Sequence, residues 1–253
     1  MGGLTVVRSL VKQLPGENFV YFGDTANIPY GNKSRDELFG YARAIIAFLL
    51  EQDVKAIVVA CGTHSSITLP ELESTCPVPL LGVVKSGARS AIRASKNGKI
   101  GLIATQASVN SGSYDKSIKE IAAAAQVSAM ACPRFVPLVE SGQLEGREVE
   151  EAVQEYIFPL MDEGIDTLVM GCTHYPFLAK TIKRYVGPDV SLVDPAVETI
   201  EELSMILIDK QIANQQSHGT GEFYVSGNEE SFHRVGSLLL GDILQKVNGI
   251  SLV

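Results

Sequence analysis

The sequence has no long apolar run, no basic leader segment and no closely spaced cysteine pair. No uninterrupted apolar stretch approaches the roughly 18 residues that a membrane-spanning helix needs. The first residues, 1–5, lack the basic and apolar segments of a secretory leader, so we expect a cytoplasmic protein that does not bind membranes. The four cysteines are widely spaced and form no C-x-x-C pair, which disfavours both a disulfide framework and a structural zinc site.

An excess of basic residues is also absent. The formal net charge is −8, so the overall field of the protein does not attract nucleic acid. With 253 residues, of which 45% are hydrophobic, the chain can bury a substantial core and form one large or two small domains. No low-complexity linker occurs, so we expect any domain boundary to be compact.

Apolar runs alternate with helical patterns along the chain. Each run is apolar at consecutive positions, as is typical of strands that are buried on both faces of a parallel sheet. Helices between such strands favour an α/β fold with a parallel sheet. The predicted strands are Phe19–Phe22, Ala56–Ala60, Ile100–Ala104, Thr167–Met170 and Val190–Val193.

Start signals predict two helices, and an amphipathic pattern predicts a third. Ser34 and Glu37 fit a capping box, with apolar residues following as far as Leu50. Pro195 opens another predicted helix. The segment 4–14 is amphipathic and follows Gly2 and Gly3 directly, where an α/β unit would normally place a strand first.

An internal similarity links two strand ends. The strand 56–60 leads into Cys61, Thr63 and His64, and the strand 167–170 leads into Cys172 and a second Thr-His pair. Each segment is predicted to continue into a helix. Ligands of open α/β sheets bind beyond the carboxyl ends of the strands, so both cysteines are candidates for one site. A helix N-terminus there would favour a thiolate and could bind a carboxylate.

Two opposed thiols are suited to inverting a stereocentre. A thiolate removes the α-proton from one face, and the thiol on the other face returns a proton. The residues alone leave other interpretations open: two small core cysteines, a Cys/His hydrolase with one essential thiol, or a Cys/His metal site. Cys76 and Cys132 have no such context and are predicted to be structural.

Longer motifs resemble those of the glutamate racemases, within the aspartate/glutamate racemase family. The similarity extends from Gly2 to about Pro195 and plausibly to the end of the chain. It is carried by residues 22–25 with 29–31, 59–61, 105–112, 132–140 and 171–176. The resemblance implies two similar doubly wound lobes with mostly parallel sheets and the active site between them. We expect the first lobe to comprise 1–84 and 197–253, and the second 85–196.

The resemblance also implies an activity and its residues. The family interconverts L- and D-glutamate for peptidoglycan, without a cofactor or metal, and commonly dimerises. Cys61 and Cys172 would be the acid/base thiols, with His174 and Glu140 assisting Cys172. The expected substrate-binding residues are Tyr30, Gly31, Gly62, Thr63, Thr105, Ser108, Thr173 and His174.

Two departures from the family pattern concern the first thiol. The family begins with a strand ending in Asp-Ser-Gly, where the Asp assists the first thiol and the Ser contacts substrate; neither residue precedes Gly2 here. The family also has an Asn at the position of Gly62 and a small residue at that of His64. A racemase-like protein that binds an acidic amino acid without efficient turnover is therefore an alternative, with any defect on the Cys61 side.

Overall fold

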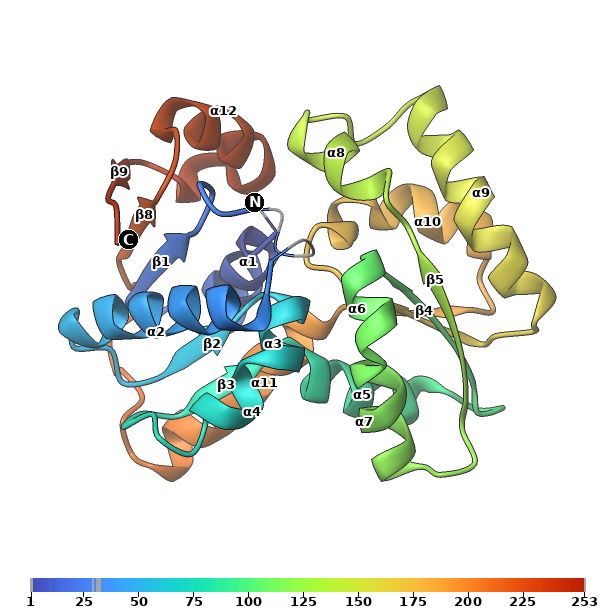
Figure 1. Cartoon of the computed structure of the whole chain (residues 1–253), viewed down its shortest axis with the longest axis horizontal. Coiled ribbons are helices and arrows are strands. Elements are labelled where there is room, and N and C mark those ends of the chain that lie inside the picture. Colours follow the sequence, from blue (N-terminus) through green and yellow to red (C-terminus); the bar gives the residue numbers. More distant parts are fainter. Residues whose placement is uncertain (1, 29, 31–32, 253) are drawn as a thin grey trace.

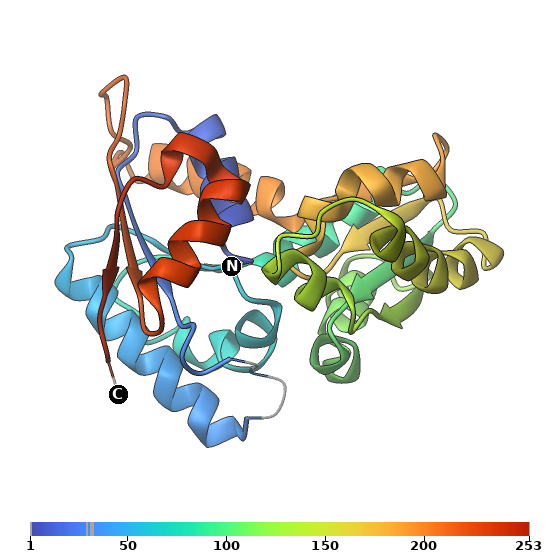
Figure 2. The same ribbon diagram turned by 90° about the horizontal axis from the view of Figure 1, so that it is seen from above.

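The structure is a computed structural model that describes residues 2–28, 30 and 33–252. Strands and helices alternate through most of the chain, and every strand pairing among the described residues is parallel. The predicted α/β fold is confirmed. Figure 1 and Figure 2 show two halves side by side, with the N-terminus between them. No helix in the described ranges is long and apolar enough to cross a membrane.

One half contains a continuous four-stranded sheet in the order β5-β4-β6-β7. Its central strands β4 and β6 are almost completely buried, as their consecutive apolar residues predict. Helices α5 and α7 lie against one another on one face, and α9 and α10 on the other. The strands are β4 (Lys99–Ala104), β5 (Gln126–Ala131), β6 (Thr167–Met170) and β7 (Ser191–Val193); these helices are α5 (Val83–Ala94), α7 (Ser113–Ile121), α9 (Arg147–Asp162) and α10 (Ala179–Val186).

The other half contains two separate sheets. One has the order β1-β8-β9, and the other pairs β2 with β3. Within the described residues, no strand precedes helix α1, in line with the sequence pattern. The strands are β1 (Phe19–Gly23), β2 (Ile57–Val59), β3 (Leu80–Gly82), β8 (Gly221–Val225) and β9 (Val247–Gly249); the helices are α1 (Leu4–Gln13), α2 (Arg35–Glu51), α3 (Gly62–Ile67), α4 (Leu69–Leu72), α11 (Pro195–Asp209) and α12 (Glu229–Leu240).

Short helical segments complete the chain. Three of them follow strands: α6 (Gln106–Ser111), α8 (Phe135–Glu140) and the 3₁₀ turn η2 (Tyr175–Leu178). The 3₁₀ turn η3 (Gly241–Ile243) follows α12. The capping box predicted for α2 is present: Ser34 accepts from the Glu37 N–H, and the Glu37 carboxylate accepts from the Ser34 N–H. Cys132 is completely buried and Cys76 half-buried, and both are free thiols.

Candidate active site

Both predicted cysteines lie where a strand ends, and both line one connected cavity of about 1510 Å³. Cys61 follows β2 and immediately precedes helix α3, and Cys172 follows β6 in the other half of the molecule. The cavity therefore joins the two halves at the carboxyl ends of their strands. Ten of the predicted site residues line it: Tyr30, Cys61, Gly62, Thr63, Thr105, Ser108, Glu140, Cys172, Thr173 and His174. Gly31 lies outside the described residues.

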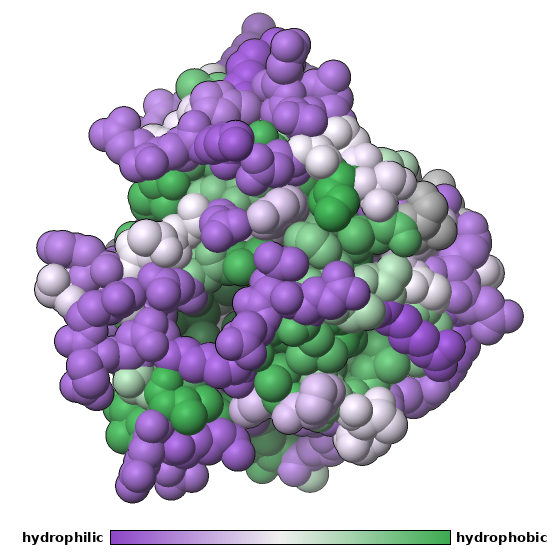
Figure 3. All heavy atoms as spheres, turned by 90° about the vertical axis from the view of Figure 1, so that its left-hand side faces the viewer, coloured by the Kyte–Doolittle hydropathy of each residue, from purple (hydrophilic) through white to green (hydrophobic). Residues whose placement is uncertain are grey.

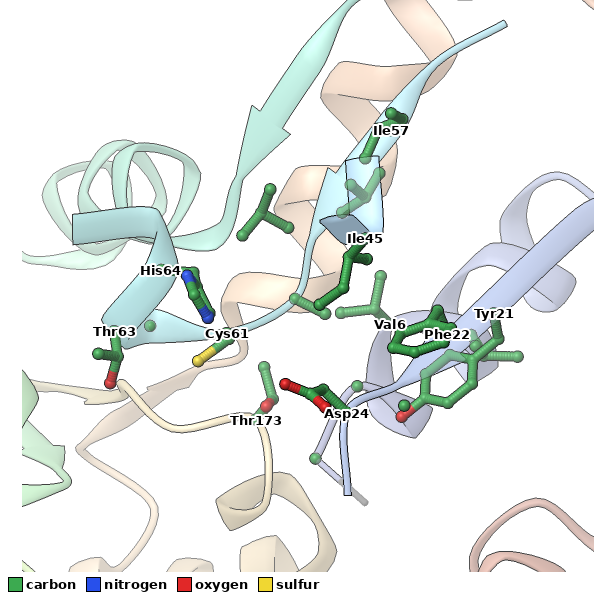
Figure 4. A pocket seen from close by; sticks show the side chains of 18 of the residues that line it. Val6, Tyr21, Phe22, Asp24, Ile45, Ile57, Cys61, Thr63, His64 and Thr173 are labelled. Carbon is green, nitrogen blue, oxygen red and sulfur yellow. The ribbon is translucent and has the colours of Figure 1, made fainter. Parts of the chain in front are cut away.

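Cys61 is surrounded mainly by hydrogen-bond donors. The backbone N–H groups of His64 and Thr63 and the Thr63 hydroxyl donate towards its sulfur. These donors favour the thiolate, but burial outweighs them and raises the pKa of the thiol above its usual value. Figure 4 shows Cys61, Thr63 and His64 at one end of the cavity. In the described part of the chain, no carboxylate or imidazole hydrogen-bonds to Cys61.

Cys172 has a basic side chain beside it. Its sulfur lies 3.6 Å from Nδ1 of His174, and Nε2 of the same ring lies 3.1 Å from Oε1 of Glu140. Burial raises the pKa of Cys172 to about 12, although the backbone N–H of His174 donates to its sulfur. Burial also lowers the pKa of His174, so the resting imidazole is neutral at pH 7. The hydrogen bond from His174 lowers the pKa of Glu140 and keeps it ionised.

The imidazole of His174 has a partner for each of its neutral forms. With the proton on Nε2, the ring donates to Glu140 and leaves the Nδ1 lone pair facing Cys172. With the proton on Nδ1, Nε2 accepts from the Gly2 N–H, which lies 3.2 Å away. The ring can therefore accept the thiol proton at Nδ1, and Glu140 then stabilises the imidazolium.

The local geometry differs between the two thiols. Each cysteine was predicted to lie in a turn between a strand and a helical segment, and both do. Helix α3 begins directly after Cys61, whereas after Cys172 the chain forms the 3₁₀ turn η2 first, and helix α10 begins only at Ala179. Pro176 has no N–H to donate to the Cys172 carbonyl, which an α-helix starting at the cysteine would require. An α-helix N-terminus therefore lies directly at Cys61 but not at Cys172.

Tyr30 is held at the cavity by a neighbouring carboxylate. Its hydroxyl donates to Oδ2 of Asp24 at 2.8 Å, and its ring contacts the His64 ring edge-on with centroids 4.5 Å apart. Asp24 also accepts from Asn27 and Ser226. Burial and the Asp24 charge raise the pKa of Tyr30, so its hydroxyl is a donor and stays protonated.

Three further predicted residues meet where α3 and α6 approach each other. Thr105 caps α6, and its hydroxyl donates to the Ser108 hydroxyl oxygen at 3.0 Å. A Cβ atom on Gly62 would lie 3.2 Å from both Ser108 Oγ and the Gly171 carbonyl oxygen. Gly62 thus permits a close approach between the cavity walls of the two halves.

His64 stands where the family has a small residue. It is buried, and its Nδ1 lies 3.1 Å from the Thr68 hydroxyl. Its Nε2 is buried with no hydrogen-bond partner among the described residues. Burial lowers the pKa of His64 to about 4, so the ring is neutral at pH 7.

One contributor to the site was missed from the sequence. The Thr5 hydroxyl, fully buried on α1, lies 3.0 Å from the Thr173 carbonyl oxygen and 3.0 Å from the Gly2 carbonyl oxygen. It fixes the turn that carries Thr173 and His174. The sequence feature that could have identified Thr5 is its hydroxyl on the apolar face of an amphipathic helix.

The cavity offers neutral donors rather than free cations. Lys55 is the only Lys or Arg among the described lining residues, and its Nζ lies 2.8 Å from Oε2 of Glu17. An anionic ligand near the thiols would therefore be held by hydroxyl and N–H groups. Such donors bind a carboxylate without adding a fixed positive charge beside the sulfurs.

Comparison with known proteins agrees with this arrangement. Residues 1–203 match the model of the Asp/Glu/Hydantoin racemase family. The glutamate racemase of Desulforudis audaxviator is 43% identical, over 100% of this chain and 95% of its own. A glutamate racemase isoform from Bacillus anthracis has a similar structure: the TM-score is 0.94 and the identity 37%, over 99% of this chain and 94% of that one.

A second solved structure was determined with a ligand. The glutamate racemase of Francisella tularensis, in complex with D-glutamate, is 34% identical with a TM-score of 0.90, over 99% of this chain and 94% of that one. The family predicted from the motifs is confirmed. With a family model that matches most of the chain and relatives that match nearly all of it, the chain belongs to the Asp/Glu/Hydantoin racemase family and is an amino-acid racemase.

Proposed function

We propose that this racemase interconverts L- and D-glutamate by proton transfer between Cys61 and Cys172, without a cofactor or metal. The observation that carries the proposal is the shared cavity, which both thiols line from opposite halves of the molecule. The glutamate named for the relatives supports the choice of substrate. Neutral donors at Thr63, Thr105 and Thr173 would hold its carboxylates.

The reaction needs one thiolate and one thiol at a time. The thiolate removes the α-proton as the Cα–H electron pair moves towards the carboxylate, and the other thiol protonates Cα from the opposite face. The first sulfur ends as a thiol and the second as a thiolate. A charge on Cys61 raises the pKa of Cys172 further, beyond the larger effect of burial, so double ionisation is disfavoured.

His174 and Glu140 act on the Cys172 side. The neutral imidazole accepts the proton of Cys172 at Nδ1, and the Glu140 carboxylate stabilises the charged ring through Nε2. When Cys172 is the acid, the same pair returns the proton. His174 is thus the base for the thiol, and Glu140 is a positioning residue that acts through it.

The test is turnover combined with exchange in D₂O. We expect the optical signal of either enantiomer to decay to zero, with deuterium appearing at the α-carbon of the product. Cys61→Ser and Cys172→Ser should each abolish racemisation. Full racemisation by either variant would contradict the two-thiol mechanism. Loss of activity after metal chelation would contradict the absence of a metal.

A second candidate is binding of an acidic amino acid without efficient turnover. It is favoured by one observation: in the described residues, Cys61 has donors around its sulfur but no side-chain base. Stabilisation of the protein by glutamate, with no deuterium at the α-carbon, would support it. Exchange at the rate of turnover would exclude it.

The cellular role rests on the family resemblance and the bacterial relatives. We propose that the enzyme supplies D-glutamate for peptidoglycan, in the cytoplasm, as a homodimer. Rescue of a bacterium that requires added D-glutamate would test the supply of D-glutamate. Sedimentation of the purified chain would test the homodimer.

A further inference from the structure

The four-stranded sheet ends on one side with strand β5, whose outer edge is unpaired. In the described chain, β5 pairs only with β4. The N–H of Gln126 donates to the Gly98 carbonyl oxygen beside β4, and the N–H of Cys132 donates to that of Ala104. Because backbone groups alternate in direction along a strand, those of the odd-numbered residues point away from β4. These residues are Val127, Ala129 and Ala131.

This outer edge is regular and accessible. Among the described residues, no backbone hydrogen bond reaches the outward-facing groups of Val127, Ala129 and Ala131. Ala129 is exposed, and its neighbours in the strand are only partly buried. All six residues of β5, which Figure 1 shows beside β4, keep a continuous register with that strand, so no bulge turns the edge away. An edge of this kind can accept a further extended chain.

The segment around β5 also lacks the residues that protect edge strands from pairing. Proteins commonly place lysine or proline on such a strand, but β5 contains neither. The chain has no charged residue from Ile121 to Pro133. Ile121, at the end of α7, adds an apolar side chain that is 50% exposed. On the left-hand face of Figure 1, by comparison, hydrophilic side chains cover much of the surface (Figure 3).

The edge is complementary to the same edge of a second copy. A two-fold axis at Ala129 sets the two β5 strands antiparallel, so that pairing extends over the full length of both. In that register Ala129 lies opposite itself, and Val127 lies opposite Ala131 of the second copy. Each such pair exchanges two hydrogen bonds, so all the outward-facing backbone groups are used. The net charge of −8 makes two copies repel each other, and an uncharged strand is where they meet without opposing like charges.

We propose that two copies of this chain join through their β5 strands, so that their four-stranded sheets form one continuous sheet. The proposal rests on the homodimer proposed above and specifies where its subunits meet. The contact lies close to the candidate active site along the chain: β5 leads through Cys132 into α8, which carries Glu140. The Cys132 carbonyl oxygen accepts from the Tyr175 hydroxyl at 3.1 Å. Joining the strands therefore also fixes the segment from which α8 begins.

The test changes the residue on the two-fold axis. Ala129 is exposed and its N–H points away from β4, so a longer side chain there leaves the sheet of each subunit intact. Ala129→Lys and Ala129→Glu each place two like charges directly opposite one another. Sedimentation should show that either variant dimerises about tenfold more weakly than the wild type, or less. An equimolar mixture of the two variants should form dimers again, because the opposed charges then attract.

Ala47→Lys, on an exposed position of α2, is the matched control and should dimerise as the wild type does. Circular dichroism checks the fold of each variant. Amide hydrogen exchange of the wild type gives a second readout that needs no substitution. The N–H of Ala129 should exchange about tenfold more slowly at high protein concentration than at low concentration. The N–H groups of Ser128 and Met130, which face β4, should be protected at both concentrations.

Three results would overturn the proposal. A dimer that tolerates both charges at Ala129 would have its contact elsewhere, and the homodimer itself would stand. Two variants that dissociate but do not combine in the mixture would exclude the two-fold register. A wild type that stays monomeric, with the Ala129 N–H unprotected at every concentration, would leave the edge to a partner other than a second copy. None of these readouts depends on racemisation, so the proposed reaction stands or falls separately.

Discussion

Nε2 of His174 lies 3.1 Å from Oε1 of Glu140, while Nδ1 of the same ring faces the sulfur of Cys172. The carboxylate therefore decides how readily the imidazole accepts the thiol proton. Glu140→Gln keeps a polar partner but removes the charge that stabilises the imidazolium. We expect kcat/KM to fall by about 10- to 100-fold, as for the loss of a hydrogen bond to a charged group.

Because the two enantiomers have equal free energy, this fall must be the same in both directions. Glu145→Gln is the matched control: its carboxylate pairs with Lys180 on the surface, and its loss should leave kcat/KM unchanged. Unchanged activity of Glu140→Gln would contradict the role given to the carboxylate.

Thr63 is the corresponding probe of the other thiol. Its hydroxyl and its backbone N–H donate to Cys61. Thr63→Val removes the hydroxyl at nearly constant shape, so the Cys61 thiolate becomes less stable, and we expect kcat/KM to fall about tenfold or more. The two variants should differ in their kinetic isotope effects. With α-deuterated substrates, Glu140→Gln should raise the isotope effect for one enantiomer, and Thr63→Val should raise it for the other enantiomer.

Gly2 is expected to tolerate no side chain. A Cβ atom there would lie 2.4 Å from Thr173 Oγ1 and 2.6 Å from His174 Nδ1. Gly2→Ala should displace the turn that carries the imidazole and lower kcat/KM by about 100-fold, as expected for a displacement near 1 Å. Gly40→Ala, on an open position of α2, is the control and should retain full activity. Activity of Gly2→Ala close to that of this control would show that the turn can adjust.

The sequence predicted β1, β2, β4, β6 and β7, which lie in mainly apolar runs, and missed β3, β5, β8 and β9. The boundaries of β6 agree with the prediction, and those of β1 and β4 differ by one residue. β5 was missed because it is a half-exposed edge strand, with small and polar residues in place of an apolar run. β3 and β9 have only three residues each, too few for a periodicity to be read.

The motifs predicted the residues of the candidate site and an asymmetry between the thiols, with His174 and Glu140 beside Cys172 only. The orientation of the two histidine rings needed coordinates. The structure places His174 against its cysteine, whereas His64 turns its Nδ1 to Thr68. Local sequence does not specify ring orientation, because that orientation depends on Glu140 and Tyr30, which come from distant segments of the chain.

His64 predicts a pH dependence of stability. Its pKa falls from 6.5 in the unfolded chain to about 4 in the folded protein, because burial disfavours the charged ring. Between these values the unfolded chain binds a proton that the folded protein does not. The contribution of His64 to the free energy of unfolding is therefore complete above about pH 6.5 and is lost as the pH falls towards 4. Below pH 4 it no longer changes. The full loss corresponds to about 3 kcal/mol.

His64→Gln retains a partner for Thr68 and removes this titration. Urea unfolding at pH 7.5 and pH 4 should show that the wild type loses about 3 kcal/mol more of its unfolding free energy than the variant does. His233→Gln removes an exposed histidine and should behave as the wild type. If His64→Gln loses as much stability as the wild type over this range, then His64 is protonated in the folded protein. In that case its unpartnered Nε2 must acquire a hydrogen-bond acceptor at low pH.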